Sequence, residues 1–311
     1  MSLGDKGKTS ASPFSIQAHN SKTTRNTDSY KMRAIKIIVS KDGYSLIKTS
    51  VLLNGQWHEG YFIIDTGSSR SMVSVGASSI SNGKEEIQGI DGKGSHGERS
   101  FTKLMICETC FPFPCLRIKR QQIPKVEYSA FGIIGTDFLL RNNLIIDYSK
   151  KSSYKGRKSL SLQMDRYALC KMELGLKGYG IPVMASIIEG QCFFLIADTG
   201  SVVNVISKDI ERSLKLSDSI PCALSIVEGI GGTMTIAETK TVLQIILLHN
   251  GKAINYAMKG IYGIKQNAGK IIRKEAANYE IDGIIGNKIL IQGKWILDYC
   301  NRIMYSTSIQ C

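Results

Sequence analysis

The sequence contains no long apolar run. None of its apolar stretches approaches the roughly 20 residues that a membrane-spanning helix requires. The opening segment MSLGDKGKTSASPFS also lacks the apolar core of a signal peptide. We therefore expect a soluble chain with no transmembrane segment. The sequence leaves its compartment open: periplasmic or secreted if a leader has been removed, and otherwise cytoplasmic.

Metal-binding residue patterns are scarce. The chain has four histidines and eight cysteines among 311 residues. Its Cys-x-x-Cys pair, Cys107 and Cys110, lies beside Cys115 in CETCFPFPC, and neither a second pair nor a histidine stands at ligand spacing. Packed thiols or a disulfide are expected there, and the sequence predicts neither a metal nor a cofactor.

Basic residues are in excess, but they are unevenly distributed. The formal net charge is +14, residues 1–33 carry six Lys/Arg against two Asp, and KKSSYKGRK at 150–158 adds five basic residues. Charge gathered in a tail and a linker is typical of solubilising segments rather than of a shaped groove. No aromatic-and-basic interleaving or helix-turn-helix pattern accompanies it. We expect no specific nucleic-acid partner.

The chain contains an internal repeat. LLNGQWHEGYFIIDTGS matches IIEGQCFFLIADTGS, IQGIDGKG matches VEGIGGTM, and FGIIGTDFLLRNNLIIDY matches DGIIGNKILIQGKWILDY. The order of the matching segments is the same in both halves, while the connections between them differ in length. The repeat predicts two copies of one domain, at 34–162 and 163–311, behind a basic disordered tail at 1–33.

Strand signals dominate both copies. Short runs rich in Ile, Val, Phe and Tyr alternate with turns of Gly, Asn, Asp and Lys. Short helices are expected in GTDFLLRNN and GNKILIQG, ended by Asn or Gly, and in SKDIERSLKL at 207–216. Asp147 and Asp298 precede polar turns in both copies and are expected to cap them. These patterns predict an all-β fold of two tandem lobes with few short helices.

In each copy an apolar run leads directly into Asp-Thr-Gly-Ser, and a Gly-Ile-Ile-Gly motif comes later in the same copy. A lone Asp-Thr-Gly is a common turn signal, but two copies with matched downstream motifs form a specific pattern. This pattern resembles the aspartic proteases, in which Asp-Thr/Ser-Gly is paired with a later apolar-apolar-Gly. The resemblance implies β-barrel lobes of the acid-protease fold, with an active-site cleft between them.

Two further stretches refine this resemblance. VEGIGGTMT resembles the flap of retroviral proteases, and the first copy lacks the flap tyrosine of pepsin-like enzymes. DTGSVVNVISKDIERSLKL resembles bacterial aspartyl proteases of retropepsin type. The chain is therefore similar to two retropepsin-like lobes fused in one polypeptide.

The resemblance implies an aspartic endopeptidase in which Asp65 and Asp198 activate a water against a peptide or protein substrate. It also assigns supporting roles. The residues that support the dyad are Thr66, Gly67, Ser68, Thr199, Gly200 and Ser201. The flap and substrate-binding residues are Gly89, Ile90, Gly92, Gly229, Ile230, Gly231 and Gly232. The two structural motifs are Ile133, Ile134, Gly135 and Ile284, Ile285, Gly286.

Two facing carboxylates cannot both ionise easily, so they are expected to share a proton. The hydroxyls of Ser68 and Ser201 are expected to donate to them and lower their apparent pKa values, so that activity favours acid. Because one chain carries both aspartates, we expect a monomer whose lobes pair intramolecularly.

Two other functions fit parts of the sequence. A catalytically silent scaffold would keep the fold and hold a peptide between its lobes. A basic adaptor would bind nucleic acid or anionic surfaces through residues 1–33. The presence of both aspartates favours the enzyme, because a scaffold gains nothing from two buried acids that face each other.

Overall fold

The computed structural model describes part of the chain, and the described residues belong to one compact unit. The described ranges are 35–74, 83–88, 94–149, 168–171, 180–188, 190–207, 213, 223–229, 232–239, 243–249, 252–258, 262–265 and 281–306. The basic tail and the 150–158 linker lie outside them, as does most of the helix predicted at 207–216.

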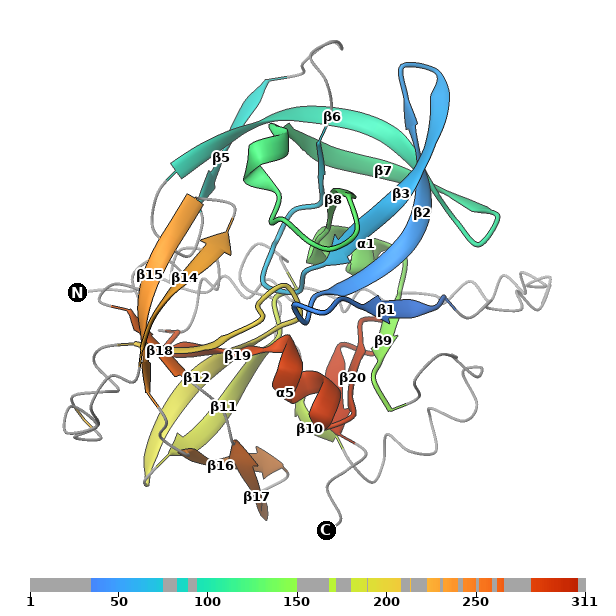
Figure 1. The fold of residues 1–311 in the computed structure, drawn as a ribbon. Helices are drawn as coiled ribbons and strands as arrows, with labels where there is room; N and C mark the ends of the chain where they lie inside the picture. Colours follow the sequence, from blue (N-terminus) through green and yellow to red (C-terminus); the bar gives the residue numbers. More distant parts are fainter. Residues whose placement is uncertain are drawn as a thin grey trace, which may run out of the picture. The chain divides into compact units, whose positions relative to one another are not determined.

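The N-terminal sheet has the strand order β1-β2-β3-β8-β4-β7-β6-β5 (Figure 1). An additional pairing between β2 and β6 closes the strands from β2 to β6 into a barrel. The strands are β1 (Ile37–Val39), β2 (Ser45–Leu53), β3 (Gln56–Ile64), β4 (Met72–Ser74), β5 (Lys84–Gln88), β6 (Gly94–Ile106), β7 (Thr109–Ile118) and β8 (Ala130–Ile134).

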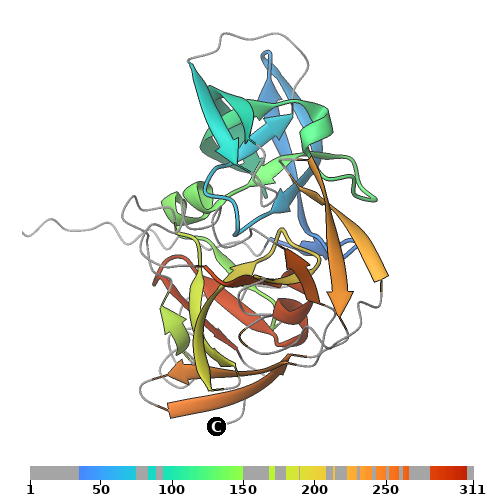
Figure 2. The ribbon, with the colours of Figure 1, turned by 90° about the vertical axis from the view of Figure 1, so that its left-hand side faces the viewer.

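The C-terminal sheet has the order β14-β15-β18-β13-β19-β12-β11-β16-β17 (Figure 2). Its strands are β11 (Val183–Ile188), β12 (Gln191–Asp198), β13 (Asn204–Ser207), β14 (Ala223–Gly229), β15 (Gly232–Thr239), β16 (Leu243–His249), β17 (Lys252–Met258), β18 (Tyr262–Lys265) and β19 (Gly283–Gly286). The central pairing matches that of the first sheet. β3–β8 and β12–β19 are parallel, and β4 and β13 run antiparallel to β8 and β19.

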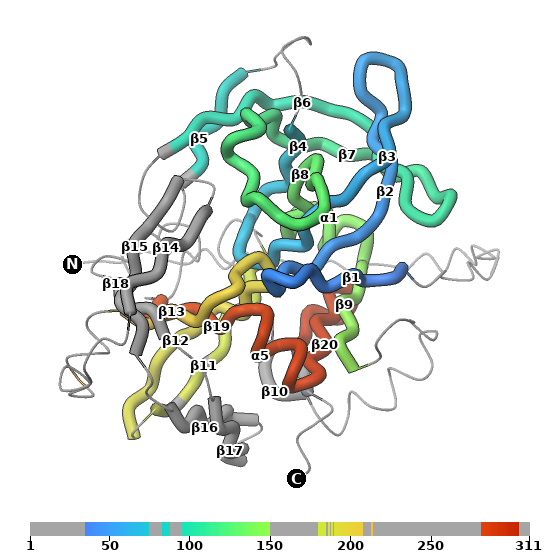
Figure 3. Tube along the Cα trace, in the orientation of Figure 1, coloured from blue at the N-terminus to red at the C-terminus, as the bar shows by residue number. Residues whose placement is uncertain are grey.

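A third sheet contains strands from both halves of the chain. Its order is β10-β21-β20-β9, made of β10 (Ala168–Lys171), β21 (Ile303–Ser306), β20 (Trp295–Asp298) and β9 (Ile145–Asp147). β9 comes from the first half of the sequence and pairs antiparallel with β20, with Ile146 opposite Leu297 (Figure 3). The two lobes therefore share main-chain hydrogen bonds as well as side-chain contacts.

The two predicted helices after the Gly-Ile-Ile-Gly motifs are confirmed. α1 (Thr136–Arg141) follows β8 and ends at Asn142, and α5 (Asn287–Gln292) follows β19 and ends at Gly293. A 3-10 turn, η1, spans Arg120–Gln122. Within the described part of the chain, no helix has the length and apolar character needed to cross a membrane. The all-β fold class with two lobes is confirmed.

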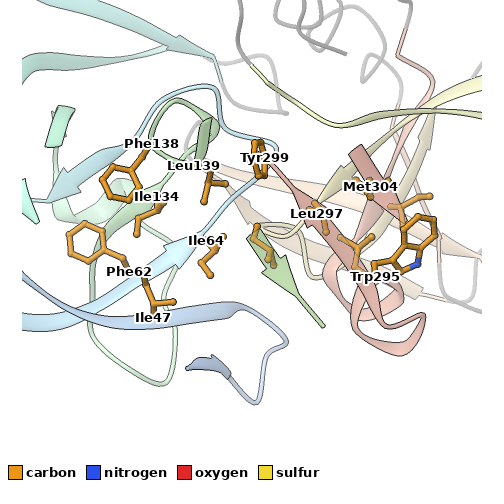
Figure 4. Packing of buried hydrophobic residues seen from close by; sticks show 14 of the residues in the cluster. Ile47, Phe62, Ile64, Ile134, Phe138, Leu139, Trp295, Leu297, Tyr299 and Met304 are labelled. Atoms are coloured by element: carbon orange, nitrogen blue, oxygen red, sulfur yellow. The ribbon is translucent and has the colours of Figure 1, made fainter. Parts of the chain in front are cut away.

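A buried cluster extends across both lobes. It includes Phe62, Phe113 and Phe138 from the first lobe, whose rings meet edge to face, and Trp295 from β20 (Figure 4). Burial of each such side chain stabilises the fold by roughly 1.5–3 kcal/mol. β3 shows how the sequence produces this core: its first residues are exposed, and Phe62 to Ile64 are buried. The strand thus enters the core just before it delivers Asp65.

Candidate active site

Asp65 and Asp198 stand at the ends of equivalent strands. Asp65 follows β3 and donates its N–H to the carbonyl of Ile134 at 3.0 Å, and Asp198 ends β12 opposite Gly286 of β19. The next turn folds back onto each carboxylate. The N–H of Gly67 donates to Asp65 Oδ1 at 2.9 Å, and that of Gly200 to Asp198 Oδ1 at 2.7 Å.

Two glycines allow the carboxylates to approach each other. A β-carbon at position 67 would lie 2.5 Å from Asp198 Oδ2, and one at position 200 would lie 2.3 Å from Asp65 Cγ. Any side chain at either position would therefore collide with the acid of the other lobe. The structure brings together the two aspartates that the sequence singled out, and it requires glycine at both positions.

The two threonines join the lobes. Thr66 Oγ1 donates to the carbonyl of Ala197 at 2.6 Å and accepts the N–H of Thr199 at 3.0 Å. Thr199 Oγ1 donates to the carbonyl of Ile64 at 2.8 Å and accepts the N–H of Thr66 at 3.1 Å. Both threonines are fully buried. These four bonds fix the end of β3 against the end of β12.

The two serines do not act as the sequence predicted. Ser68 Oγ donates to the carbonyl of Arg70 and Ser201 Oγ to that of Val203, both at 2.8 Å, rather than to the carboxylates. A serine hydroxyl readily bonds a carbonyl two residues away in a turn, and here this local bond replaces the expected one. The serines favour the ionised acids only through their main-chain N–H groups, not through their hydroxyls.

The Gly-Ile-Ile-Gly motifs brace the aspartate loops from behind. Their four isoleucines are buried in β8 and β19, namely Ile133, Ile134, Ile284 and Ile285. Gly135 directly follows β8, and Gly286 is the last residue of β19. The residue after each motif bonds the aspartate loop of its own lobe. Thr136 N–H donates to Ser68 O at 2.9 Å, and Asn287 N–H donates to Ser201 O at 2.7 Å.

Electrostatics distinguish the two acids. Burial raises the pKa of both carboxyls above the ordinary range, and the charge of Asp198 raises the pKa of Asp65 further. Their mutual hydrogen bond raises the pKa of Asp65 and lowers that of Asp198, as the N–H groups of Gly200, Gly67 and Ser201 also do. The expected lowering of both pKa values is therefore wrong, because burial outweighs the donors. The pKa of Asp65 is raised well above its ordinary value, and that of Asp198 is raised as well.

The raised pKa of Asp65 predicts an unusual dependence of stability on pH. The folded chain holds this proton more tightly than the unfolded chain. The resulting stability is present below the ordinary Asp pKa of about 3.9 and is lost as the pH rises through the folded-state pKa. Because Asn cannot ionise, Asp65→Asn should raise the melting temperature at about pH 7.5, and by less at about pH 3. A constant difference across this range would contradict the assignment.

The proposed flap residues are only partly within the described chain. Gly229 and Gly232 face each other at the end of the β14–β15 hairpin, while Ile230 and Gly231 between them lie outside the described residues. Gly89, Ile90 and Gly92, between β5 and β6, also lie outside. The flap role thus stays a prediction. Among the described residues, no cluster of His, Cys, Asp or Glu could hold a metal ion.

Sequence analysis missed Tyr148 and Asn287, whose side chains hydrogen-bond each other between the two halves of the chain. The signal available was the repeated Asp-Tyr of LIIDYS and WILDYC, of which only the aspartates were interpreted. Those aspartates do cap turns. Asp147 Oδ1 accepts the N–H of Ser149 at 2.8 Å, and Asp298 Oδ1 accepts that of Asn301 at 2.9 Å.

Comparison with known proteins agrees with this geometry at the level of the fold. No protein-family model and no curated protein matches the chain. Among solved structures, the chain is similar to the crystal structure of the aspartic proteinase from Irpex lacteus. The match covers 89% of this chain and 97% of that one, at 11% sequence identity and a TM-score of 0.51. At this identity the similarity shows a shared fold.

Proposed function

We propose that this protein is an aspartic-type endopeptidase that hydrolyses peptide bonds between Asp65 and Asp198. The observation that carries the proposal is the pair of partly buried carboxyls, one from each lobe, joined by a hydrogen bond and held by reciprocal threonine bonds. The similarity in fold to an aspartic proteinase supports it. We further propose that the lobes are copies of one retropepsin-like domain of bacterial type, with boundaries at 34–162 and 163–311.

The pKa directions suggest a division of labour. Ionised Asp198 acts as the general base and takes a proton from the attacking water, while Asp65 donates its proton to the oxygen of the scissile carbonyl. The tetrahedral species collapses when Asp198 passes the proton taken from water to the leaving nitrogen, which breaks the C–N bond, and a hydroxyl of the species returns a proton to Asp65. The chemistry requires only water and the two carboxyls, so the proposal includes no cofactor.

The proposal is tested by incubating the full chain with a peptide library between about pH 3 and pH 7, with and without pepstatin. We expect cleavage that pepstatin inhibits and that requires one carboxyl to be ionised and the other protonated. The pKa values of both acids are raised, so both limbs of the pH profile should lie above those expected for ordinary aspartates. Binding of pepstatin without cleavage at any pH would instead indicate the silent scaffold.

A further inference from the structure

A ring of three side chains, the buried Ser45 and Asn287 and the partly buried Tyr148, lies on the Asp198 side of the lobe junction. Asn287 Nδ2 donates to Ser45 Oγ at 3.0 Å, the hydroxyl of Tyr148 donates to Asn287 Oδ1 at 2.7 Å, and Ser45 Oγ lies 2.7 Å from the Tyr148 oxygen. The Tyr148 hydroxyl has one proton and donates it to Asn287, so the Ser45 hydroxyl must donate to the Tyr148 oxygen. Each member therefore donates to one neighbour and accepts from the other.

The orientation of the amide in this ring is fixed by the main chain. Asn287 Nδ2 also donates to the carbonyl of Gly43 at 2.6 Å, and a carbonyl can only accept. Burial raises the pKa of Tyr148, so its hydroxyl stays protonated and keeps donating. The ring is a fully satisfied buried network, the kind that fixes geometry most firmly.

The ring connects the Asp198 loop to the other lobe. Asn287 begins α5, and its N–H holds the carbonyl of Ser201, three residues after Asp198. Its side chain reaches Gly43 and Ser45 of the N-terminal lobe. One residue therefore bonds the loop that carries the aspartate with its main chain and the opposite lobe with its side chain.

The equivalent position on the Asp65 side carries different residues. There, Thr136 replaces Asn287 after the Gly-Ile-Ile-Gly motif, and Tyr299 replaces Tyr148 after the Ile/Leu-Asp pair. Tyr299 is buried in the main cluster with Leu139 (Figure 4), and its hydroxyl has no hydrogen-bond partner among the described residues. The two tyrosines thus form a matched pair: one hydroxyl is bonded in the ring, and the other has no hydrogen-bond partner in the described part of the chain.

We propose that Asn287, Ser45 and Tyr148 are positioning residues that hold the Asp198 loop in register with the N-terminal lobe, an inference that rests on the proposed function. The threonine bonds fix the strands leading into the dyad, and the ring fixes the loop leading out of it. A carboxylate that acts as a base must stay aligned with its water. A displacement of about 1 Å can cost roughly 10²-fold in rate.

The test replaces Asn287 by the residue found at the equivalent place in the other lobe. Asn287→Thr should keep the main-chain bond to Ser201 and lose the cross-lobe bonds. We expect kcat to fall roughly 10- to 100-fold with KM unchanged. The amide protons of Thr66 and Thr199, which bond across the lobes, should exchange faster with solvent. Tyr148→Phe preserves volume and should also lower kcat and speed the exchange of these two amides. This variant tests the inference if Asn287→Thr does not fold.

Tyr299→Phe is the matched control. It removes a buried hydroxyl without a described partner, so kcat and the exchange of both threonine amides should match wild type, with an equal or higher melting temperature. An unchanged kcat in both ring variants, or a rise in KM alone, would overturn the inference in an active enzyme. If the wild type cleaves nothing, the proposed function fails separately, and unchanged exchange in the ring variants would still overturn the ring as a link between lobes.

Discussion

Replacing either Asp65 or Asp198 by Asn is expected to lower kcat/KM by roughly 10²- to 10⁴-fold, the range attributable to general acid–base catalysis. In the proposed mechanism the two carboxyls share one proton and serve as base and acid in the same step, so neither can substitute for the other. The measurement is the initial rate on the best library peptide, at the pH optimum of the wild type.

Asp42→Asn provides the matched control for this pair. Asp42 is exposed in the turn after β1, so the same change of carboxylate to amide should leave the rate at the wild-type value. Full activity in Asp65→Asn or in Asp198→Asn would show that the dyad is not the catalytic centre. Equal losses in all three variants would point to a nonspecific effect of charge.

The reciprocal threonine bonds should dominate the stability of the lobe junction. Thr66→Val keeps the side-chain shape but leaves the N–H of Thr199 and the carbonyl of Ala197 without their partner. At about 1–3 kcal/mol for each of these two unsatisfied buried groups, we expect a loss of roughly 2–6 kcal/mol in the free energy of unfolding. Thr199→Val should cost a similar amount, through the N–H of Thr66 and the carbonyl of Ile64.

Urea unfolding monitored by intrinsic fluorescence measures this loss as a shift in midpoint. The control is Thr109→Val, because Thr109 is exposed at the start of β7, where substitutions change stability by only about 0.5 kcal/mol. If the midpoints of Thr66→Val and Thr109→Val coincide, the threonine bonds do not hold the lobes together.

Local sequence patterns predicted the strands and the two short helices that follow the Gly-Ile-Ile-Gly motifs. Phe62 to Ile64 and Leu195 to Ala197 are apolar runs that end at an acid and a glycine, and both form buried strands ending at the dyad. Asn142 and Gly293 ended their helices as expected, because their effect on the chain is local. The approach of Asp65 to Asp198 was predictable because the repeat gave both copies the same geometry.

Interactions between segments far apart in the chain could not be predicted from the sequence. The ring joins residues separated by 103, 139 and 242 positions, and no periodicity relates Ser45, Tyr148 and Asn287. The repeat gives no sign of the ring, because Thr136 and Asn287 occupy matching positions and differ only in the length and chemistry of their side chains. The prediction that the serine hydroxyls donate to the carboxylates failed because of a local interaction, not a distant one. A bond to a carbonyl two residues away competed with the carboxylate, and a motif does not show which acceptor wins.

The central claim is that one chain makes one complete active site, and mixing the two single mutants tests it most directly. If the lobes pair within the chain, a mixture of Asp65→Asn and Asp198→Asn contains only sites with one Asp and one Asn. The account therefore predicts no cleavage by the mixture and a wild-type rate proportional to enzyme concentration. Recovery of activity on mixing, or a wild-type rate that rises with the square of concentration, would contradict it by showing that lobes pair between chains.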